Sequence, residues 1–391
     1  MGIQARTWWI VAGLALGPAI SNGFARFAYG LLLPSMRSDL DWTFTQAGWI
    51  NTANAIGYLI GAVLALSIIS RTGAKPLFIG GLALTAGALV ASGLTRDFTV
   101  LSFWRTMAGI GGAPVFIAGG VIASSLFADD KPRNALAIAV YFGGGGLGML
   151  ICGIALPDMI ARGGHIVWPS AWVLIGIASG IASVPAIWSA LKAPPDVKAE
   201  KKGTAPPLPI WRMSPALAAY FMFGLGYTIY ITFLIAWMRA GGAKWSEVSF
   251  TWAVMGAMVM VSPFLWRGVL ARAEGGGAIA ATLLASATGV AIALLVGGTW
   301  GVVTSAALFG ASFFMVPTST TTFGRKNLRE AQWGASLSLF TVLFSLGQII
   351  GPVGAGALAD LVGGVEEGLI ASALILAIGA AIGMMQRPLR K

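Results

Sequence analysis

The sequence predicts an all-α membrane protein with twelve transmembrane helices, and its composition and apolar patterning carry this prediction. Of the 391 residues, 57% are hydrophobic and 10% are charged, and the mean hydropathy is +0.82. Soluble proteins contain about 25% charged residues. Apolar runs of about 20 residues, the length that crosses a bilayer as a helix, recur along the whole chain. We therefore do not expect a soluble enzyme.

Turn and charge signals separate the apolar runs. The clearest breaks are SRTGAKP at residues 70–76, TRD at 95–97, ADDKPRN at 128–134 and GGAK at 241–244. The twelve predicted segments cover residues 8–33, 45–69, 76–94, 98–122, 134–156, 168–191, 214–238, 246–266, 277–297, 300–323, 331–358 and 368–386. The first is longer than a signal-peptide core and no convincing cleavage site follows it, so we expect it to remain as a membrane anchor.

The basic residues predict the orientation of these segments. With both termini in the cytoplasm, eighteen Lys and Arg residues fall in inside segments and five in outside loops, as the positive-inside rule requires. The longest polar stretch, residues 192–213, is rich in Pro and Lys and is interpreted as a cytoplasmic linker. It divides the chain into an N-terminal six-helix bundle, residues 1–191, and a C-terminal six-helix bundle, residues 214–391. Two related bundles around a midplane site are typical of transporters.

Several other functions are disfavoured by the residues present. The net charge of +11 is explained by the cytoplasmic loops, so we expect no nucleic-acid partner. A single cysteine, Cys152, and a single histidine, His165, cannot supply a disulfide, zinc or haem site, and we expect no metal or cofactor. The run Gly143 to Gly146 lacks the Lys-Ser/Thr of a phosphate loop, which favours helix packing over nucleotide binding. No catalytic cluster indicates an enzyme.

Several motifs resemble the major facilitator superfamily. Arg71, Gly73 and Lys75 match its loop after helix 2, while Ser70 occupies the acidic position of that loop. RTMAGIGGA at 105–113 is similar to the signature of the fourth helix, and YFGGGGLG at 141–148 lies near the Gly-rich motif of the fifth. The string FARFAYGLLLPSMRSDLDW at 24–42 is most similar to the YbfB/YjiJ-like bacterial subgroup.

The resemblance implies two pseudo-symmetric bundles in which helices 1, 4, 7 and 10 line a cavity that opens alternately to either side. It also implies a multi-pass protein of the bacterial inner membrane. The residues for which it implies a role in gating or conformational change are Arg71, Gly73, Lys75, Gly109, Gly144 and Gly148.

Two arginines, Arg26 and Arg105, lie deep in predicted segments, where an unpaired charge is costly. The first segment runs outward and the fourth inward, so both residues lie about 10–12 Å below the outer end. If both face the cavity, as the resemblance implies, they converge on one anion, and Arg suits bidentate contacts with carboxylate, sulfonate or phosphate. In the alternative, each arginine bonds backbone carbonyls or an acid such as Glu247 and holds helices together. For Arg105, helix packing and proton coupling remain alternatives to ligand binding.

Acidic residues favour the anion interpretation by their positions. All fourteen lie in loops or at segment ends, whereas a cation or multidrug exporter usually needs a buried carboxylate. Proton coupling would then depend on the substrate carboxyl group or on an acid at a helix end.

Polar side chains that share predicted helix faces are further candidates to bind substrate, with interhelical hydrogen bonding as the alternative. The candidates besides the two arginines are Asn22, Tyr29, Asn54, Tyr58, Tyr227 and Tyr230. The hydroxyl run from Thr318 to Thr322 follows Pro317, and its predicted role is kink repair, an inner gate or substrate binding.

We therefore expect a secondary active transporter that moves a small organic anion of carboxylate type, coupled to protons or to exchange. We expect it to act as a monomer in the lipid bilayer. Export of hydrophobic or zwitterionic compounds is the alternative within transport. A non-transporting receptor or scaffold is the alternative from another class, although residues 192–213 leave little room for a signalling domain.

Overall fold

The computed structural model describes residues 3–195 and 206–389, and these form helices with no strand among them. The elements of the N-terminal half are α1 (Ile3–Pro18), the π-helix η1 (Ala19–Phe27), α2 (Ala28–Asp39), α3 (Phe44–Thr72), α4 (Ala74–Ser92), α5 (Phe98–Ser125), α6 (Lys131–Gly163), the short helix η2 (His165–Val167) and α7 (Trp168–Lys192). Those of the C-terminal half are α8 (Ile210–Ala240), α9 (Trp245–Arg272), α10 (Gly277–Val296), α11 (Gly298–Phe313), α12 (Met315–Asn327), the short helix η3 (Glu330–Gln332), α13 (Trp333–Val362) and α14 (Glu366–Met384).

Twelve helical stretches of the described residues are long and apolar enough to cross a bilayer, which confirms the predicted number. The first consists of α1, η1 and α2 in one continuous span, and the tenth consists of α11 and α12. Observed spans extend past several predicted ends because polar residues that close an apolar run still lie on the helix. At the start of α6, for example, the Asp130 side chain caps the helix by accepting a hydrogen bond from the Arg133 N–H at 3.0 Å.

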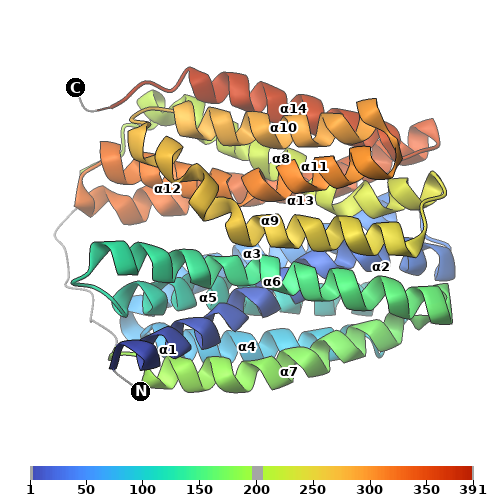
Figure 1. The fold of residues 1–391 in the computed structure, drawn as a ribbon, viewed down its shortest axis with the longest axis horizontal. Helices are drawn as coiled ribbons and strands as arrows, with labels where there is room; N and C mark the ends of the chain where they lie inside the picture. Colours follow the sequence, from blue (N-terminus) through green and yellow to red (C-terminus); the bar gives the residue numbers. More distant parts are fainter. Residues whose placement is uncertain (1–2, 196–205, 390–391) are drawn as a thin grey trace. The chain divides into compact units, whose positions relative to one another are not determined.

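The described residues cluster into two compact units. In Figure 1 the first is coloured blue to green, and the second yellow-green to red except for the short blue segment Thr43–Gly48. The first unit holds the described parts of Met1–Trp42 and Trp49–Ala199, and the second those of Thr43–Gly48 and Glu200–Lys391. In the first unit α4 packs against α5 and α7, and α1 packs against α6 and α7. In the second unit α8 packs against α13 and α14, and α10 packs against α11 and α14.

Two details concern the borders of these units. The segment Thr43–Gly48 groups with the second unit, where the Asp360 carboxylate accepts hydrogen bonds of 2.7 and 2.8 Å from the backbone N–H groups of Phe44 and Thr45. The middle of the predicted linker, residues 196–205, lies outside the described residues, so the linker 192–213 stays a prediction.

The first span contains a π-helical turn that the apolar pattern did not predict. At its end the Ala28 N–H donates to the Gly23 carbonyl, five residues back. Pro18, directly before the turn, has no N–H and removes one hydrogen bond of a regular α-helix. All nine residues of η1 are buried. Turns of this kind inside α-helices frequently mark functional sites.

The tenth span is interrupted at Phe314, between α11 and α12. Pro317 lies in the first turn of α12, where a missing N–H is tolerated, and its ring would collide with the carbonyl of residue 313 in a continuous helix. The break therefore follows from the proline that the sequence analysis singled out.

Exposed faces of the helices are apolar. On α7, Leu174, Ile177, Ile181 and Val184 each expose half or more of their surface. In water such a face would be destabilising, whereas in a bilayer it contacts lipid chains. The described part of the chain thus has the surface of a membrane protein.

Glycines allow the first span to pack backbone to backbone against α6. A Cβ atom added to Gly144 would overlap the carbonyl oxygen of Ala15, and one added to Gly148 would overlap that of Ala19. Gly144, in the run that the sequence predicts to pack helices, thus packs α6 against α1, and Gly148 packs it against the π-turn.

We predict that Gly144→Ala lowers the apparent melting temperature of the purified protein. The added methyl group must push α6 away from α1, and overpacking of this kind costs about 1–3 kcal/mol. The matched control is Gly87→Ala in α4, where an added Cβ meets no atom within 4 Å and the substitution favours the helix. A thermal-unfolding measurement that finds both variants equally stable would contradict the close packing of α1 on α6.

Candidate functional site

Arg105, on α5, is fully buried in the first unit and is surrounded by groups that solvate its charge. Its Nη2 donates to the backbone carbonyl of Ala25 in η1 at 2.7 Å. The guanidinium carbon lies 4.5 Å from the centroid of the Trp172 ring and 5.6 Å from that of the Tyr29 ring. Its Nε and Nη1 make no hydrogen bond with any described residue. For these two nitrogens the positive charge is instead stabilised by the faces of the two aromatic rings. Arg105 therefore ties α5 to the π-turn and to α7.

Arg26, at the end of the π-turn, has a different environment. It is 6% exposed, and its guanidinium carbon lies 5.1 Å from the centroid of the Tyr58 ring on α3. Within residues 3–195 and 206–389 it makes no hydrogen bond or ion pair. Arg26 thus presents a nearly buried cation with its hydrogen-bonding capacity unused.

The structure brings the backbone next to Arg26 within reach of Arg105. Arg105 bonds the carbonyl of Ala25, the residue before Arg26, and the two positive charges repel each other electrostatically. The equal depths in the membrane that the sequence predicts stay a prediction. An anion near both guanidinium groups would relieve the repulsion, since it is attracted by both charges.

Of the other candidates in the first unit, only some have side chains beside these arginines. Tyr58 lies under the Arg26 guanidinium, and Tyr29 lies beside Arg105. The Asn54 amide donates to the backbone carbonyl of Arg105 at 3.1 Å, so it links α3 to α5. The Asn22 amide makes one long contact of 3.4 Å with the Ser21 hydroxyl.

The second unit places Tyr227 and Tyr230 in different surroundings. Tyr227, on α8, belongs to a stack of nearly parallel rings: its ring centroid lies 5.7 Å from that of Phe344 and 5.9 Å from that of Phe313. Its hydroxyl accepts a hydrogen bond from the Gln348 amide. Tyr230 is fully buried, and its hydroxyl lies 2.6 Å from that of Ser305 on α11. Tyr230 therefore joins α8 to α11.

The residues expected to act in conformational change lie either around the junction of α3 and α4 or at close contacts between helices. Gly73 has a positive φ of 84° at the start of α4, and the Lys75 ammonium donates to the Ala193 carbonyl at 2.7 Å, just past the end of α7. Arg71 is exposed. Gly109 packs α5 against α3, since an added Cβ would overlap the carbonyl oxygen of Asn54, and Gly144 and Gly148 pack α6 against the first span.

The hydroxyl run of α12 bonds mainly to its own helix. The Thr320 and Thr321 hydroxyls both donate to the Pro317 carbonyl at 2.9 Å, and the Ser319 hydroxyl donates to the Met315 carbonyl at 2.8 Å. These bonds support the first turns of α12 after the break at Phe314. Because the hydroxyl protons are used within the helix, these bonds favour the interpretation that the run repairs the kink. The hydroxyl oxygens can still accept hydrogen bonds.

The residues of these sites that the sequence analysis missed include Trp172, Phe344 and Gln348. Tryptophans are usually found at the ends of membrane segments, whereas Trp172 lies inside its predicted segment. This unusual position could have marked it as a candidate. Gln348 is an amide in the middle of an apolar segment, which is a similar signal. Nothing in the sequence distinguishes Phe344 from the other phenylalanines.

No group of three or more His, Cys, Asp or Glu side chains that could hold a metal ion occurs within residues 3–195 and 206–389.

Comparisons with known proteins agree with the fold. The chain is 25% identical over 349 residues to the inner membrane transport protein YdhP of Escherichia coli O157:H7, covering 88% of this chain and 87% of that protein. It is 25% identical over 236 residues to the 3-(3-hydroxy-phenyl)propionate transporter of Escherichia coli K12, covering 59% of this chain and 54% of that protein. The crystal structure of a bacterial homologue of the human lysosomal transporter Spinster matches with a TM-score of 0.72 at 16% identity, over 98% of this chain and 97% of that one.

Residues 19–384 match the family described as "Uncharacterised MFS-type transporter YbfB". Together with the twelve membrane-length helices, this match assigns the chain to transporters rather than enzymes. The chain belongs to the YbfB-type family of the major facilitator superfamily.

Proposed function

We propose that this transporter moves a small organic anion of carboxylate type across the bacterial inner membrane, by alternating access coupled to protons or to exchange. The observation that carries the proposal is the environment of Arg26, a 6% exposed cation without a hydrogen bond or ion pair to any described residue. A guanidinium binds carboxylate oxygens in a bidentate manner, and such charge-assisted bonds are strong away from water. Arg105 then has a positioning role, because it fixes the carbonyl next to Arg26.

One relative supports this substrate class. The similar Escherichia coli K12 protein is named a 3-(3-hydroxy-phenyl)propionate transporter, and this compound carries a carboxylate on a two-carbon chain attached to an aromatic ring. In the first unit the Tyr58 ring lies beneath Arg26. The arginine suits the carboxylate of such a molecule, and the tyrosine ring suits its aromatic ring.

The proposal is tested directly by counterflow in proteoliposomes. Vesicles loaded with an unlabelled aromatic carboxylate should accumulate the same labelled compound, and a receptor without transport activity should not. A zwitterionic or uncharged compound that exchanges while every carboxylate fails would reject the anion assignment. A thermal-shift screen of carboxylates, sulfonates and phosphates selects the compounds, because a ligand that binds the folded state stabilises it.

We expect Arg26→Gln to weaken binding of the carboxylate by about 10- to 100-fold, as charge-assisted hydrogen bonds contribute about 1.5–3 kcal/mol. Arg26→Lys should recover only part of the affinity, because an ammonium keeps the charge but lacks the planar fork. The matched control is Arg162→Gln, at an exposed arginine paired with Asp158, which should bind normally. Affinity and melting temperature are measured together. Unchanged affinity in a folded Arg26→Gln protein would reject the anion site.

Arg105→Lys should act on stability first. The ammonium is more strongly hydrated and stacks poorly on Trp172, so we expect the apparent melting temperature to fall by about 2–5 °C. Carboxylate affinity should fall less than in Arg26→Gln. An Arg105→Lys protein with normal stability but with affinity as low as that of Arg26→Gln would make Arg105 the direct ligand.

We further propose that both termini and residues 192–213 face the cytoplasm, as the distribution of Lys and Arg indicates. The test uses single cysteines in a Cys152→Ala background, which should transport normally because Cys152 is buried and has no disulfide partner. An impermeant maleimide added to intact cells should label His165→Cys, and it should label Arg329→Cys only after permeabilisation. The reverse pattern would invert the topology.

A further inference from the structure

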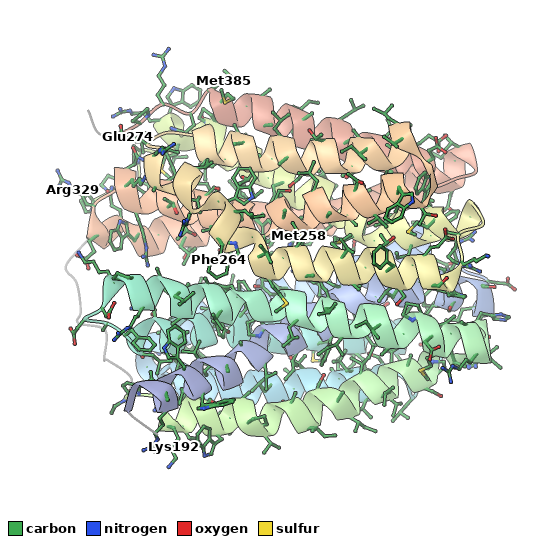
Figure 2. All side chains as sticks on the ribbon, in the orientation of Figure 1. Lys192, Met258, Phe264, Glu274, Arg329 and Met385 are labelled. Atoms are coloured by element: carbon green, nitrogen blue, oxygen red, sulfur yellow. The ribbon has the colours of Figure 1, made fainter. Side chains whose placement is uncertain are left out.

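An open cavity of about 170 Å³ lies in the second unit, lined by residues of α8, α12 and α13. It is near the end of that unit at which α12 finishes and α13 begins. Figure 2 shows Glu274 and Arg329 at this end. An enclosed cavity of about 150 Å³ holds one benzene molecule. This pocket is open, since Arg325, Trp333 and Gly334 on its wall are exposed, and its volume is similar.

The apolar part of the cavity wall is aromatic. Tyr220 comes from α8, and Trp333 and Phe340 come from α13. The ring centroids of Tyr220 and Phe340 lie 5.7 Å apart in an edge-to-face arrangement. Walls of this kind favour a flat ring over a flexible aliphatic chain, since aromatic pairs gain energy beyond the area that they bury.

The charged part of the wall is Arg325, on α12. Its guanidinium carbon lies 5.5 Å from the centroid of the Trp333 ring, and Arg325 makes no ion pair with an acid of the described chain. No acidic side chain lines the cavity. An anion is therefore favoured over a cation.

Hydroxyl groups complete the polar part of the wall. Ser336 is buried and lines the cavity, and its hydroxyl makes no hydrogen bond with any residue that the structure describes. It is a free donor at a position where a carboxylate oxygen would accept. Thr341 also lines the cavity, and its hydroxyl donates to the Leu337 carbonyl at 2.8 Å.

We propose that this cavity is a second ligand site, separate from Arg26, for a small aromatic carboxylate. The carboxylate accepts hydrogen bonds from the Arg325 guanidinium and the Ser336 hydroxyl, and the ring lies among Tyr220, Trp333 and Phe340. The charge of the wall disfavours aromatic amines.

The test measures ligand binding in this cavity alone, through the reactivity of a cysteine placed in its wall. Thr341→Cys in the Cys152→Ala background is alkylated with N-ethylmaleimide in the purified full-length protein, and benzoate is the probe. Benzoate should slow alkylation. Acetate, which lacks the ring, and benzamide, which lacks the charge, should need at least about tenfold higher concentrations for the same protection.

Variants then separate this site from the one at Arg26. Arg325→Gln should raise the benzoate concentration needed for protection by about 10- to 100-fold. Arg329→Gln, four residues further along and outside the cavity wall, is the matched control and should leave protection unchanged. Arg26→Gln should also leave it unchanged. Loss of protection in Arg26→Gln would overturn a separate site, whereas failure of the anion proposal at Arg26 would not alter the result at Thr341→Cys.

A second variant covers the case in which Arg325→Gln does not fold. Gly334 lines the cavity, and an added Cβ there meets no atom within 4 Å, so Gly334→Leu should fold and occupy the space. It should abolish protection by benzoate. Protection that survives in Gly334→Leu, or that benzamide gives as well as benzoate, would overturn the proposal.

Discussion

A charge inside the hydrocarbon region must be solvated by the protein itself, and this constraint governs the first unit. Water is absent there, so a guanidinium needs carbonyl oxygens, aromatic faces or a bound anion. Arg105 obtains the first two from Ala25, Trp172 and Tyr29. These contacts connect α5, the π-turn and α7, so the solvation of one cation also fixes the relative positions of three helical elements.

Close backbone packing makes this arrangement possible. The π-turn can reach Arg105 on one side because α6 meets the first span with glycines on the other, at Gly144 and Gly148. Asn54 secures the neighbouring helix by bonding the backbone of Arg105. The position of Arg26 is therefore set by packing on several sides. Its charge faces the Tyr58 ring but has no hydrogen bond or ion pair among the described residues. Rigid support of this kind is what a binding group needs to hold a ligand at little entropic cost.

The sequence predicted the features that depend on composition and spacing along the chain. It predicted twelve spans and the turns between them, because hydropathy is a local property. It did not predict which arginine is enclosed, since Trp172 and Tyr58 meet their arginines across 67 and 32 residues of chain. It also missed the π-turn and the cavity beside Arg325, because neither leaves a periodic signature. Contacts between distant helices determine both.

The π-turn in the first span also changes how this helix is compared with those of relatives. A turn with bonds to the fifth residue back contains one residue more than the α-helical turn that it replaces, so the side chains before Ala19 and after Phe27 follow two helical wheels offset by about 100°. A single wheel drawn over residues 3–39 assigns one half to the wrong face. Suppose that a relative lacks one residue within 19–27. An alignment then matches the outward-facing positions of both α1 and α2 only if the gap is placed inside the π-turn. Such a helix is therefore aligned by its faces in three dimensions, with any gap of one residue placed within residues 19–27.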